Sequence, residues 1–163
     1  MTKDAAPNYS NLILAARNIR QFIHPTPLFH SSILDESIGG HILLKAETFQ
    51  RTGSFKFRGA FNKMRLLKAR ETNTKIVSWS SGNHAQAVAA AANILGLHAA
   101  IIMPTDAPKA KIDGTHRHGG EIIFYNRENE VREKIGESLA KERNAIIVPP
   151  YDDPDVIAGQ GTV

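Results

Sequence analysis

Residues 75–148 alternate short apolar runs with helical stretches, and this alternation constrains the fold more than any other feature of the sequence. The apolar runs cover 75–79, 97–103, 121–125 and 145–148, and turn signals separate them from the helical stretches. Strands that alternate with helices form parallel sheets, because each helix returns the chain across the sheet. The sequence therefore predicts an α/β fold, an open parallel sheet with helices on both faces.

The helices between these strands have start and stop signals of their own. An alanine-rich helix is predicted for 85–95, ending at Gly96. A second helix is predicted to be capped by Asp106 and to reach about Arg117. A polar amphipathic helix is predicted for 127–143. Each helix links two successive strands along the chain.

The residues before position 75 predict separate elements. Apolar residues at helical spacing predict a helix that follows Asn8 and ends near Pro25. A short helix is predicted after Ser31, closed by Gly39 and Gly40. The apolar run 42–47 reads as a buried strand.

The predicted elements divide the chain into three parts. Residues 1–74 are interpreted as the N-terminal part of a large domain, which a polar break at 71–74 ends. Residues 75–150 form a complete small α/β domain, and 151–163 begin a return to the large domain. Because the last residues look like the opening of a helix, we expect the sequence to be an N-terminal fragment with a truncated large domain.

Composition narrows the class of function. The net charge of +4 is spread through mixed-sign runs, which favours solvated helix faces over a nucleic-acid interface. The absence of cysteine excludes disulfides and thiolate chemistry. No stretch approaches the roughly 18 apolar residues of a membrane span, and residues 1–10 lack a signal-peptide pattern. We predict a cytoplasmic protein that binds neither membranes nor nucleic acid.

Lys56 is the first candidate for chemistry. It lies between Gly53 and Gly59, where the apolar series from Phe57 begins a helical period. A lysine amine forms Schiff bases with carbonyl compounds, and the positive potential of a helix start lowers its pKa. The plainer alternative is an ordinary surface lysine of a helix. Spacing alone does not decide between them.

The segment Ser80-Ser81-Gly82-Asn83-His84-Ala85-Gln86 is the second candidate. It lies between the carboxyl end of a predicted strand and the start of a helix, which is where open α/β sheets bind ligands. Free backbone N–H groups and small polar side chains there favour a carboxylate or a phosphate. The plainer alternative is a capped turn without a ligand.

Together the two segments resemble the fold-type II pyridoxal phosphate enzymes, whose architecture is like that of the tryptophan synthase beta subunit. The branch is that of serine/threonine dehydratases and serine racemases, and it includes threo-3-hydroxyaspartate ammonia-lyase. Three further segments match this branch: His24-Pro25-Thr26-Pro27-Leu28, Met103-Pro104 with Ala107-Pro108, and Ala158-Gly159-Gln160-Gly161-Thr162. The resemblance spans nearly the whole chain.

The resemblance implies roles for individual residues. Lys56 matches the lysine that holds pyridoxal 5'-phosphate, Phe55 matches the residue packed on the cofactor ring, and Asn83 matches the partner of the ring hydroxyl. Ser80, Ser81, Asn83 and His84 match the group that receives the carboxylate of a small amino-acid substrate. The implied reaction begins when Lys56, displaced by the substrate amine, removes the α-proton. Loss of the β-hydroxyl then gives a keto acid and ammonia.

Ser81 separates branches of the family. Racemisation needs a second acid/base group on the cofactor face opposite the lysine, and a serine at this position resembles serine racemases and hydroxyaspartate ammonia-lyases. Dedicated threonine dehydratases usually carry alanine there. The resemblance therefore implies L-serine, L-threonine or 3-hydroxyaspartate as substrate, with serine racemisation as an added activity.

Some features of the family fall outside this sequence. Its glycine-rich phosphate loop and its divalent-cation site lie further along in relatives, so no metal ligand is predicted here. Five residues occupy positions where relatives with a nucleotide effector bind it: Ser31, Ser32, Ile33, Arg51 and Thr52. The resemblance also implies that the intact parent is a homodimer.

Two alternatives to the ammonia-lyase remain. One is a β-replacing enzyme of the same fold, as in the cysteine synthase branch, against which Ser81 and the segment His84-Ala85-Gln86 argue. The other is an inactive fragment or binding module that lacks the phosphate loop. In that case Lys56 stays unmodified.

Overall fold

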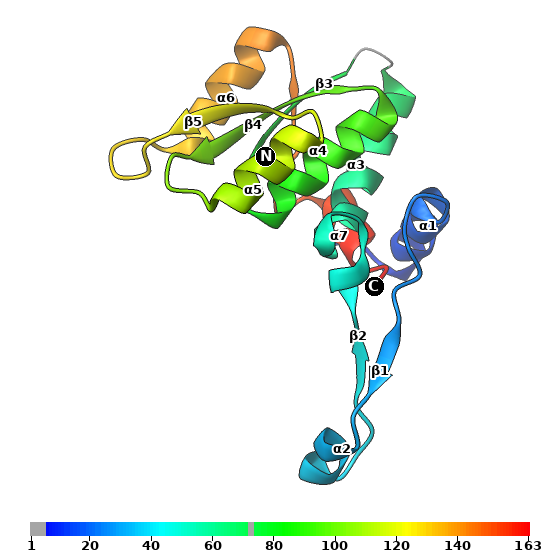
Figure 1. The fold of residues 1–163 in the computed structure, drawn as a ribbon. Coiled ribbons are helices and arrows are strands. Elements are labelled where there is room, and N and C mark those ends of the chain that lie inside the picture. The colour runs from blue at the N-terminus through cyan, green and yellow to red at the C-terminus, as the bar shows by residue number, and fades with distance from the viewer. Residues whose placement is uncertain (1–5, 72–73) are drawn as a thin grey trace.

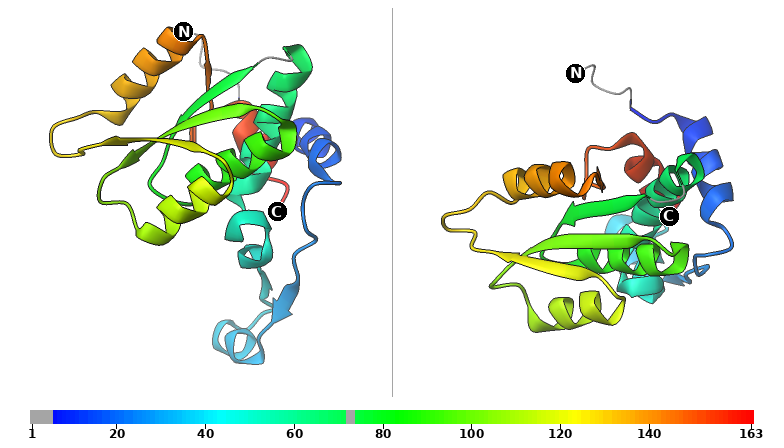
Figure 2. Two further views of the ribbon diagram at one scale, coloured as in Figure 1. Left: turned by 45° about the horizontal axis from the view of Figure 1, so that its top comes forward. Right: turned by 90° about the horizontal axis from the view of Figure 1, so that it is seen from above.

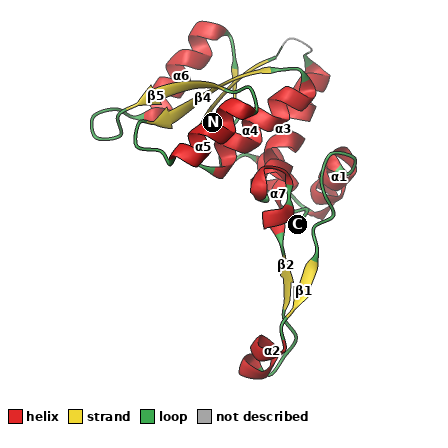
Figure 3. Cartoon of the chain, viewed as in Figure 1, coloured by secondary structure: helices red, strands yellow, loops and turns green. Residues whose placement is uncertain are grey.

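The structure, a computed structural model, describes residues 6–71 and 74–163. Its helices and strands are shown in Figure 1 and are coloured by type in Figure 3. They are α1 (Tyr9–Ile19), β1 (Leu28–His30), α2 (Ser32–Ile38), β2 (Leu43–Lys45), α3 (Lys56–Arg70), β3 (Lys75–Trp79), α4 (Asn83–Leu95), β4 (His98–Pro104), α5 (Lys109–Arg117), β5 (Glu121–Tyr125), α6 (Arg132–Arg143), β6 (Ile146–Ile147) and α7 (Pro154–Gln160). Two short 3-10 helices, Glu47–Phe49 and Arg51–Gly53, connect β2 to α3.

A four-stranded sheet forms the centre of the molecule, in the order β5-β4-β3-β6. All three pairings are parallel, with Val77 of β3 opposite Ala100 of β4 on one side and Ile147 of β6 on the other. The predicted parallel α/β fold is confirmed. The sheet order also reverses at β3, because β4 and β5 extend from one side of it and β6 joins the other.

The two faces of this sheet bury different side chains. On one face Ile76, Ile101 and Met103 join a large apolar cluster with residues of α3 and α4. On the other face Trp79 and Ile102 lie in a smaller cluster that includes residues of α6. Figure 2 shows α6 on one side of the sheet and α4 and α5 on the other. Strand residues alternate between the faces, as expected for strands covered on both sides.

Helices α3 and α7 cross at two glycines. A Cβ on Gly59 would lie 2.6 Å from the carbonyl oxygen of Val156, and a Cβ on Gly159 would lie 2.6 Å from that of Arg58. Only glycine permits two backbones to approach this closely. The crossing fixes the first turns of α3 against the C-terminal segment.

The β1–α2–β2 hairpin, residues 28–45, projects from the rest of the molecule as an arm (Figure 1). Strands β1 and β2 pair antiparallel, and helix α2 joins them. The prediction of a buried strand at 42–47 is wrong in its burial, because Leu43 is 61% exposed and Leu44 is 47% exposed. The short helix after Ser31 is confirmed, with Ser31 as its N-cap and Gly39 in the left-handed region at its end.

Three predicted helix boundaries are wrong. Helix α1 ends at Ile19 rather than near Pro25. Asp106 is not a helix cap, because α5 begins only after Pro108, and the Asp106 carboxylate instead accepts from Arg127 Nη2 at 2.9 Å. A proline disfavours helical backbone in the residue before it, which delays the start of α5. Helix α6 begins at Arg132, five positions later than predicted.

The remaining predictions concern spans and domain limits. None of the helices in the described part of the chain has both the length and the apolar character needed to cross a membrane. The predicted polar break at 71–74 includes residues 72 and 73, which lie outside the described residues. The division at 74 and 150 stays a prediction.

Candidate functional site

Lys56 is the first residue of α3, as predicted. Its Nζ donates a hydrogen bond to the carbonyl oxygen of Pro150 at 2.9 Å. Burial lowers the pKa of the Lys56 amine below its usual range, because the charged form loses hydration. The ring of Phe55 lies beside it, with 5.3 Å between Nζ and the ring centroid. Lys56 is therefore a partly buried amine with an aromatic neighbour.

The segment 80–84 follows β3 at the carboxyl end of the sheet. Helix α4 begins at Asn83, so Asn83 and His84 belong to its first turn. The backbone N–H of Gly82 donates to Ser80 Oγ at 3.1 Å, which folds the turn back on itself. Ser80 and Ser81 are half-buried. The first N–H groups of a helix have no partner within it, so this turn presents donors to an anion.

His84 is buried, and it is held within the core. Its Nε2 lies 3.3 Å from the carbonyl oxygen of Val148, while its Nδ1 is buried and has no hydrogen-bond partner among the described residues. Burial, aided by the nearby positive charge of Lys56 and opposed by the Val148 hydrogen bond, lowers the pKa of His84 to about 4. The imidazole is therefore neutral at physiological pH, and its Nε2–H donates to the Val148 carbonyl.

The Lys56 amine and the His84 imidazole converge on one short segment of chain. Lys56 binds the carbonyl of Pro150, and His84 binds the carbonyl of Val148, which also accepts from Ser78 Oγ at 2.8 Å. This segment follows β6, which is the neighbour of β3 in the sheet. The two candidate groups thus lie at the carboxyl ends of β3 and β6, where the strand order reverses. Such a reversal is where open α/β sheets bind ligands.

The structure adds residues that the sequence did not indicate. Lys111 of α5 donates from Nζ to Asn83 Oδ1 at 2.5 Å, which places a positive charge next to the first turn of α4. The carbonyl groups of Val148 and Pro150 hold the two candidate side chains. The two prolines after the last predicted strand indicate that the strand ends there. They do not indicate that this segment lies beside β3, because that depends on the order of the strands in the sheet.

The arrangement combines a nucleophile with an anion site. Lys56 supplies an amine whose lowered pKa leaves more of it uncharged, which is the form that attacks a carbonyl carbon. The first turn of α4 supplies N–H donors, the helix dipole and the side chains of Ser80 and Ser81. Chemically, the site suits a ligand with one carbonyl group and one carboxylate.

Two aspartates at the start of α7 have structural roles. Asp153 caps α7 by accepting from the N–H groups of Asp155 and Val156, and the two carboxylates of Asp153 and Asp155 bind Lys63 at 2.9 and 3.0 Å.

The five residues of the predicted effector site are divided between two places. Ser31, Ser32 and Ile33 lie at the tip of the arm, whereas Arg51 and Thr52 line a cavity beside α4. The nucleotide prediction stays a prediction.

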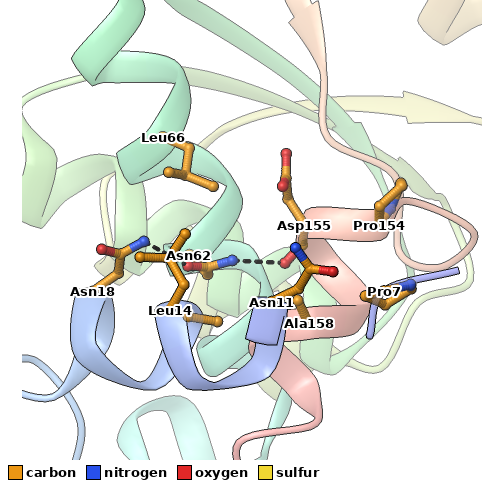
Figure 4. Close-up of a pocket in the computed structure, with 10 residues that line it drawn as sticks. Pro7, Asn11, Leu14, Asn18, Asn62, Leu66, Pro154, Asp155 and Ala158 are labelled. Atoms are coloured by element: carbon orange, nitrogen blue, oxygen red, sulfur yellow. Dashed lines mark hydrogen bonds between the residues drawn. The ribbon is translucent and has the colours of Figure 1, made fainter. Parts of the chain in front are cut away.

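A cavity of about 280 Å³ lies away from this site, between α1, α3 and α7 (Figure 4). Its lining includes three asparagines, and its floor is fixed by hydrogen bonds. Asn62 Nδ2 donates to the carbonyl of Asp155 at 2.8 Å, and Asn18 donates to Asn62 Oδ1 at 3.5 Å. Neither Lys56 nor the segment 80–84 lines it.

Comparison with known proteins gives concordant matches. The profile of the family described as "Pyridoxal-phosphate dependent enzyme" matches residues 19–163. The chain is 46% identical over 155 residues to L-threo-3-hydroxyaspartate ammonia-lyase of Pseudomonas sp, which covers 95% of this chain and 49% of that protein. It is 42% identical over 156 residues to serine racemase of Schizosaccharomyces pombe, covering 96% of this chain and 48% of that one.

Solved structures agree with these sequence matches. The structure of maize serine racemase superposes with a TM-score of 0.91 at 35% identity, over 97% of this chain and 48% of that chain. The chain therefore spans about half the length of the relatives it matches.

Proposed function

Because the chain belongs to the family of pyridoxal-phosphate dependent enzymes, we propose that it carries the lysine and the carboxylate-binding turn of an ammonia-lyase for hydroxy amino acids. The candidate substrates are L-serine, L-threonine and 3-hydroxyaspartate, and the products are a keto acid and ammonia. Matched relatives named L-threo-3-hydroxyaspartate ammonia-lyase and serine racemase support this choice. The main support for the proposal is that Lys56 and His84, in the first turn of α4, both contact the segment that follows β6.

The residues present fit pyridoxal phosphate. Lys56 offers an amine of lowered pKa to its aldehyde, and Phe55 offers an aromatic face beside that amine. Asn83 is exposed at the first turn of α4, and its side chain would reach the ring hydroxyl. When bound, pyridoxal phosphate supplies an electron sink for charge at the substrate α-carbon.

The residues of this chain then have separate tasks. Lys56, held by the Pro150 carbonyl, accepts the α-proton at Nζ when it is uncharged. The N–H groups at the start of α4, with the Ser80 and Ser81 hydroxyls, hold the substrate carboxylate. Because the His84 imidazole is buried, this residue contributes its backbone N–H to the carboxylate.

Ser81 is proposed as the second acid/base group, which would allow racemisation. In the Ser81→Ala variant we expect formation of the D-amino acid to stop while elimination from the L-substrate continues. Chiral chromatography of the amino acid and a keto-acid assay measure the two reactions. Unchanged D-product in the variant contradicts this role.

A second candidate function is a binding module that does not turn over substrate and in which Lys56 stays unmodified. It is favoured by the arm, whose apolar side chains stay exposed. A homodimeric assembly and a cytoplasmic location belong to the proposal as well. The exposed apolar side chains of the arm support the first, and the absence of cysteine supports the second.

A keto-acid assay tests the two candidates together. The 163-residue chain is incubated with pyridoxal phosphate and each of the three substrates, and keto acid is measured as its hydrazone against cofactor alone. We expect release that Lys56→Ala abolishes and that the control Lys109→Ala, at an exposed lysine, retains. No release and no cofactor trapped on Lys56 by borohydride support the binding module and contradict the ammonia-lyase. Cofactor trapped on Lys56 without release of keto acid contradicts both.

A further inference from the structure

Two histidines and an aspartate meet at the tip of the arm, far from the sheet (Figure 1). His30 ends β1, Asp35 lies in α2, and His41 precedes β2. His30 Nε2 is 2.6 Å from Asp35 Oδ2, and His41 Nδ1 is 3.1 Å from the same oxygen. The three candidate ligand atoms lie within 4.8 Å of one another. Three chain segments thus bring metal-binding atoms to one point.

Asp35 is oriented by the backbone. Its Oδ1 accepts from the N–H of Ile42 at 2.7 Å, which turns Oδ2 toward both imidazoles. In metal sites, the side chains that bind the metal are commonly held in orientation by hydrogen bonds to their other polar atoms.

We propose that His30, Asp35 and His41 bind a divalent transition cation of the Zn²⁺ class. Two imidazole nitrogens and one carboxylate oxygen are a protein ligand set that zinc accepts, with a fourth position open to water. Mg²⁺ and Ca²⁺ prefer oxygen ligands throughout, so this set selects against them. The site lies outside the proposed catalytic function and does not depend on it.

The spacing of the ligand atoms fits such an ion after a small expansion. Bonds of about 2.0–2.1 Å in a tetrahedron separate neighbouring ligand atoms by roughly 3.3 Å. The His41–Asp35 distance of 3.1 Å lies just below this value, and the His30–Asp35 distance of 2.6 Å lies further below it. The side chains of His30 and His41 are 56% and 92% exposed, so both imidazoles have room to move outward.

A bound metal would stabilise the tip of the arm, which has no apolar core of its own. Helix α2 buries none of its residues, β1 is exposed along its length, and β2 is exposed at Leu43 and Leu44. An ion held by these three side chains would link β1, α2 and the start of β2. A unit without a core gains stability from a bound metal because binding favours the folded form.

Zinc titration of the 163-residue chain tests the proposal. Isothermal calorimetry with ZnCl₂ at pH 7.5 is performed on the wild type, on His41→Ala and on His30→Ala. His98→Ala is the matched control, because His98 is an exposed histidine that also neighbours a carboxylate, that of Glu121. We expect one zinc per chain, at least about a tenfold loss of affinity in each arm variant, and no change in the control.

A second readout separates loss of ligands from loss of folding. Histidine-selective NMR of the wild type shows which imidazole resonances move when zinc is added, and circular dichroism confirms that His41→Ala remains folded. Movement confined to His30 and His41 supports the site. The absence of zinc binding, equal weakening by His98→Ala, or full competition by MgCl₂ overturns it.

Discussion

The sheet of β3–β6 and the β1–α2–β2 arm use apolar residues in opposite ways. In the sheet, Ile76, Val77, Ile101 and Ile102 are almost completely covered by helices of the same chain. In the arm, the strands place their apolar side chains at the surface, and α2 buries none. The comparison teaches that similar apolar runs lead to a self-contained core in one region and to an exposed surface in the other.

Different interactions hold the two regions. The sheet is held by burial of apolar area, which is the main source of stability in folded proteins. The arm is held by its hairpin hydrogen bonds and by Asp35, and it is anchored at its base by a buried ion pair. In that pair Arg58 Nη2 donates to Glu47 Oε1 at 2.7 Å. The contrast predicts which substitutions are costly.

The largest effect is expected for Ile101→Ala in β4. Ile101 is fully buried in the larger apolar cluster, so the variant should lose about 2–5 kcal/mol of the free energy of unfolding. Urea denaturation followed by circular dichroism measures the loss. A loss of less than about 1 kcal/mol in the free energy of unfolding would contradict the contrast between sheet and arm, because replacing a buried isoleucine by alanine rarely costs so little stability.

A pH-dependent effect of about 3 kcal/mol is expected from His84. Its folded pKa of about 4 lies below the ordinary 6.5, so the unfolded chain binds a proton first as the pH falls. This contribution to stability is complete above pH 6.5 and is lost as the pH falls toward 4. Urea denaturation at pH 7.5 and 4.5 should show a smaller difference for His84→Gln than for wild type.

The control for this prediction is His98→Gln. His98 is a largely exposed histidine of β4, and its replacement should leave the pH dependence as in the wild type. If the two variants show the same difference in stability between pH 7.5 and 4.5, His84 is not the main cause of the loss of stability in acid.

The smallest effect is expected for Ile33→Ala in the arm. Ile33 is 78% exposed, so the stability of the chain should change by no more than about 0.5 kcal/mol. The same substitution type thus gives a large loss at Ile101 and almost none here. A loss at Ile33 comparable to that at Ile101 would show that another surface covers the arm in solution.

The sheet could be predicted from the sequence almost strand by strand. Residues 75–79 and 121–125 match β3 and β5, because alternation with helices and turn signals is a local pattern. The burial of 42–47 could not be predicted in the same way. An apolar strand indicates that something covers it, but not whether that cover lies within the same chain.

The candidate site could be predicted only in part. The position of Lys56 at a helix start and of Ser80–His84 after a strand follow from local pattern. The contacts with Val148 and Pro150 do not, because they require β6 to lie beside β3, and strand order is a long-range property. The same limit applies to Lys111, whose contact with Asn83 depends on how α5 packs on α4.

The most direct measurement is the location of trapped cofactor. The chain is incubated with pyridoxal phosphate and reduced with borohydride, and each pyridoxyl-lysine is located by mass spectrometry over a range of pH. The lowered pKa of Lys56 predicts label concentrated there rather than on exposed lysines such as Lys109. Label spread evenly over several lysines at every pH, or absent from Lys56, would contradict the two-part site.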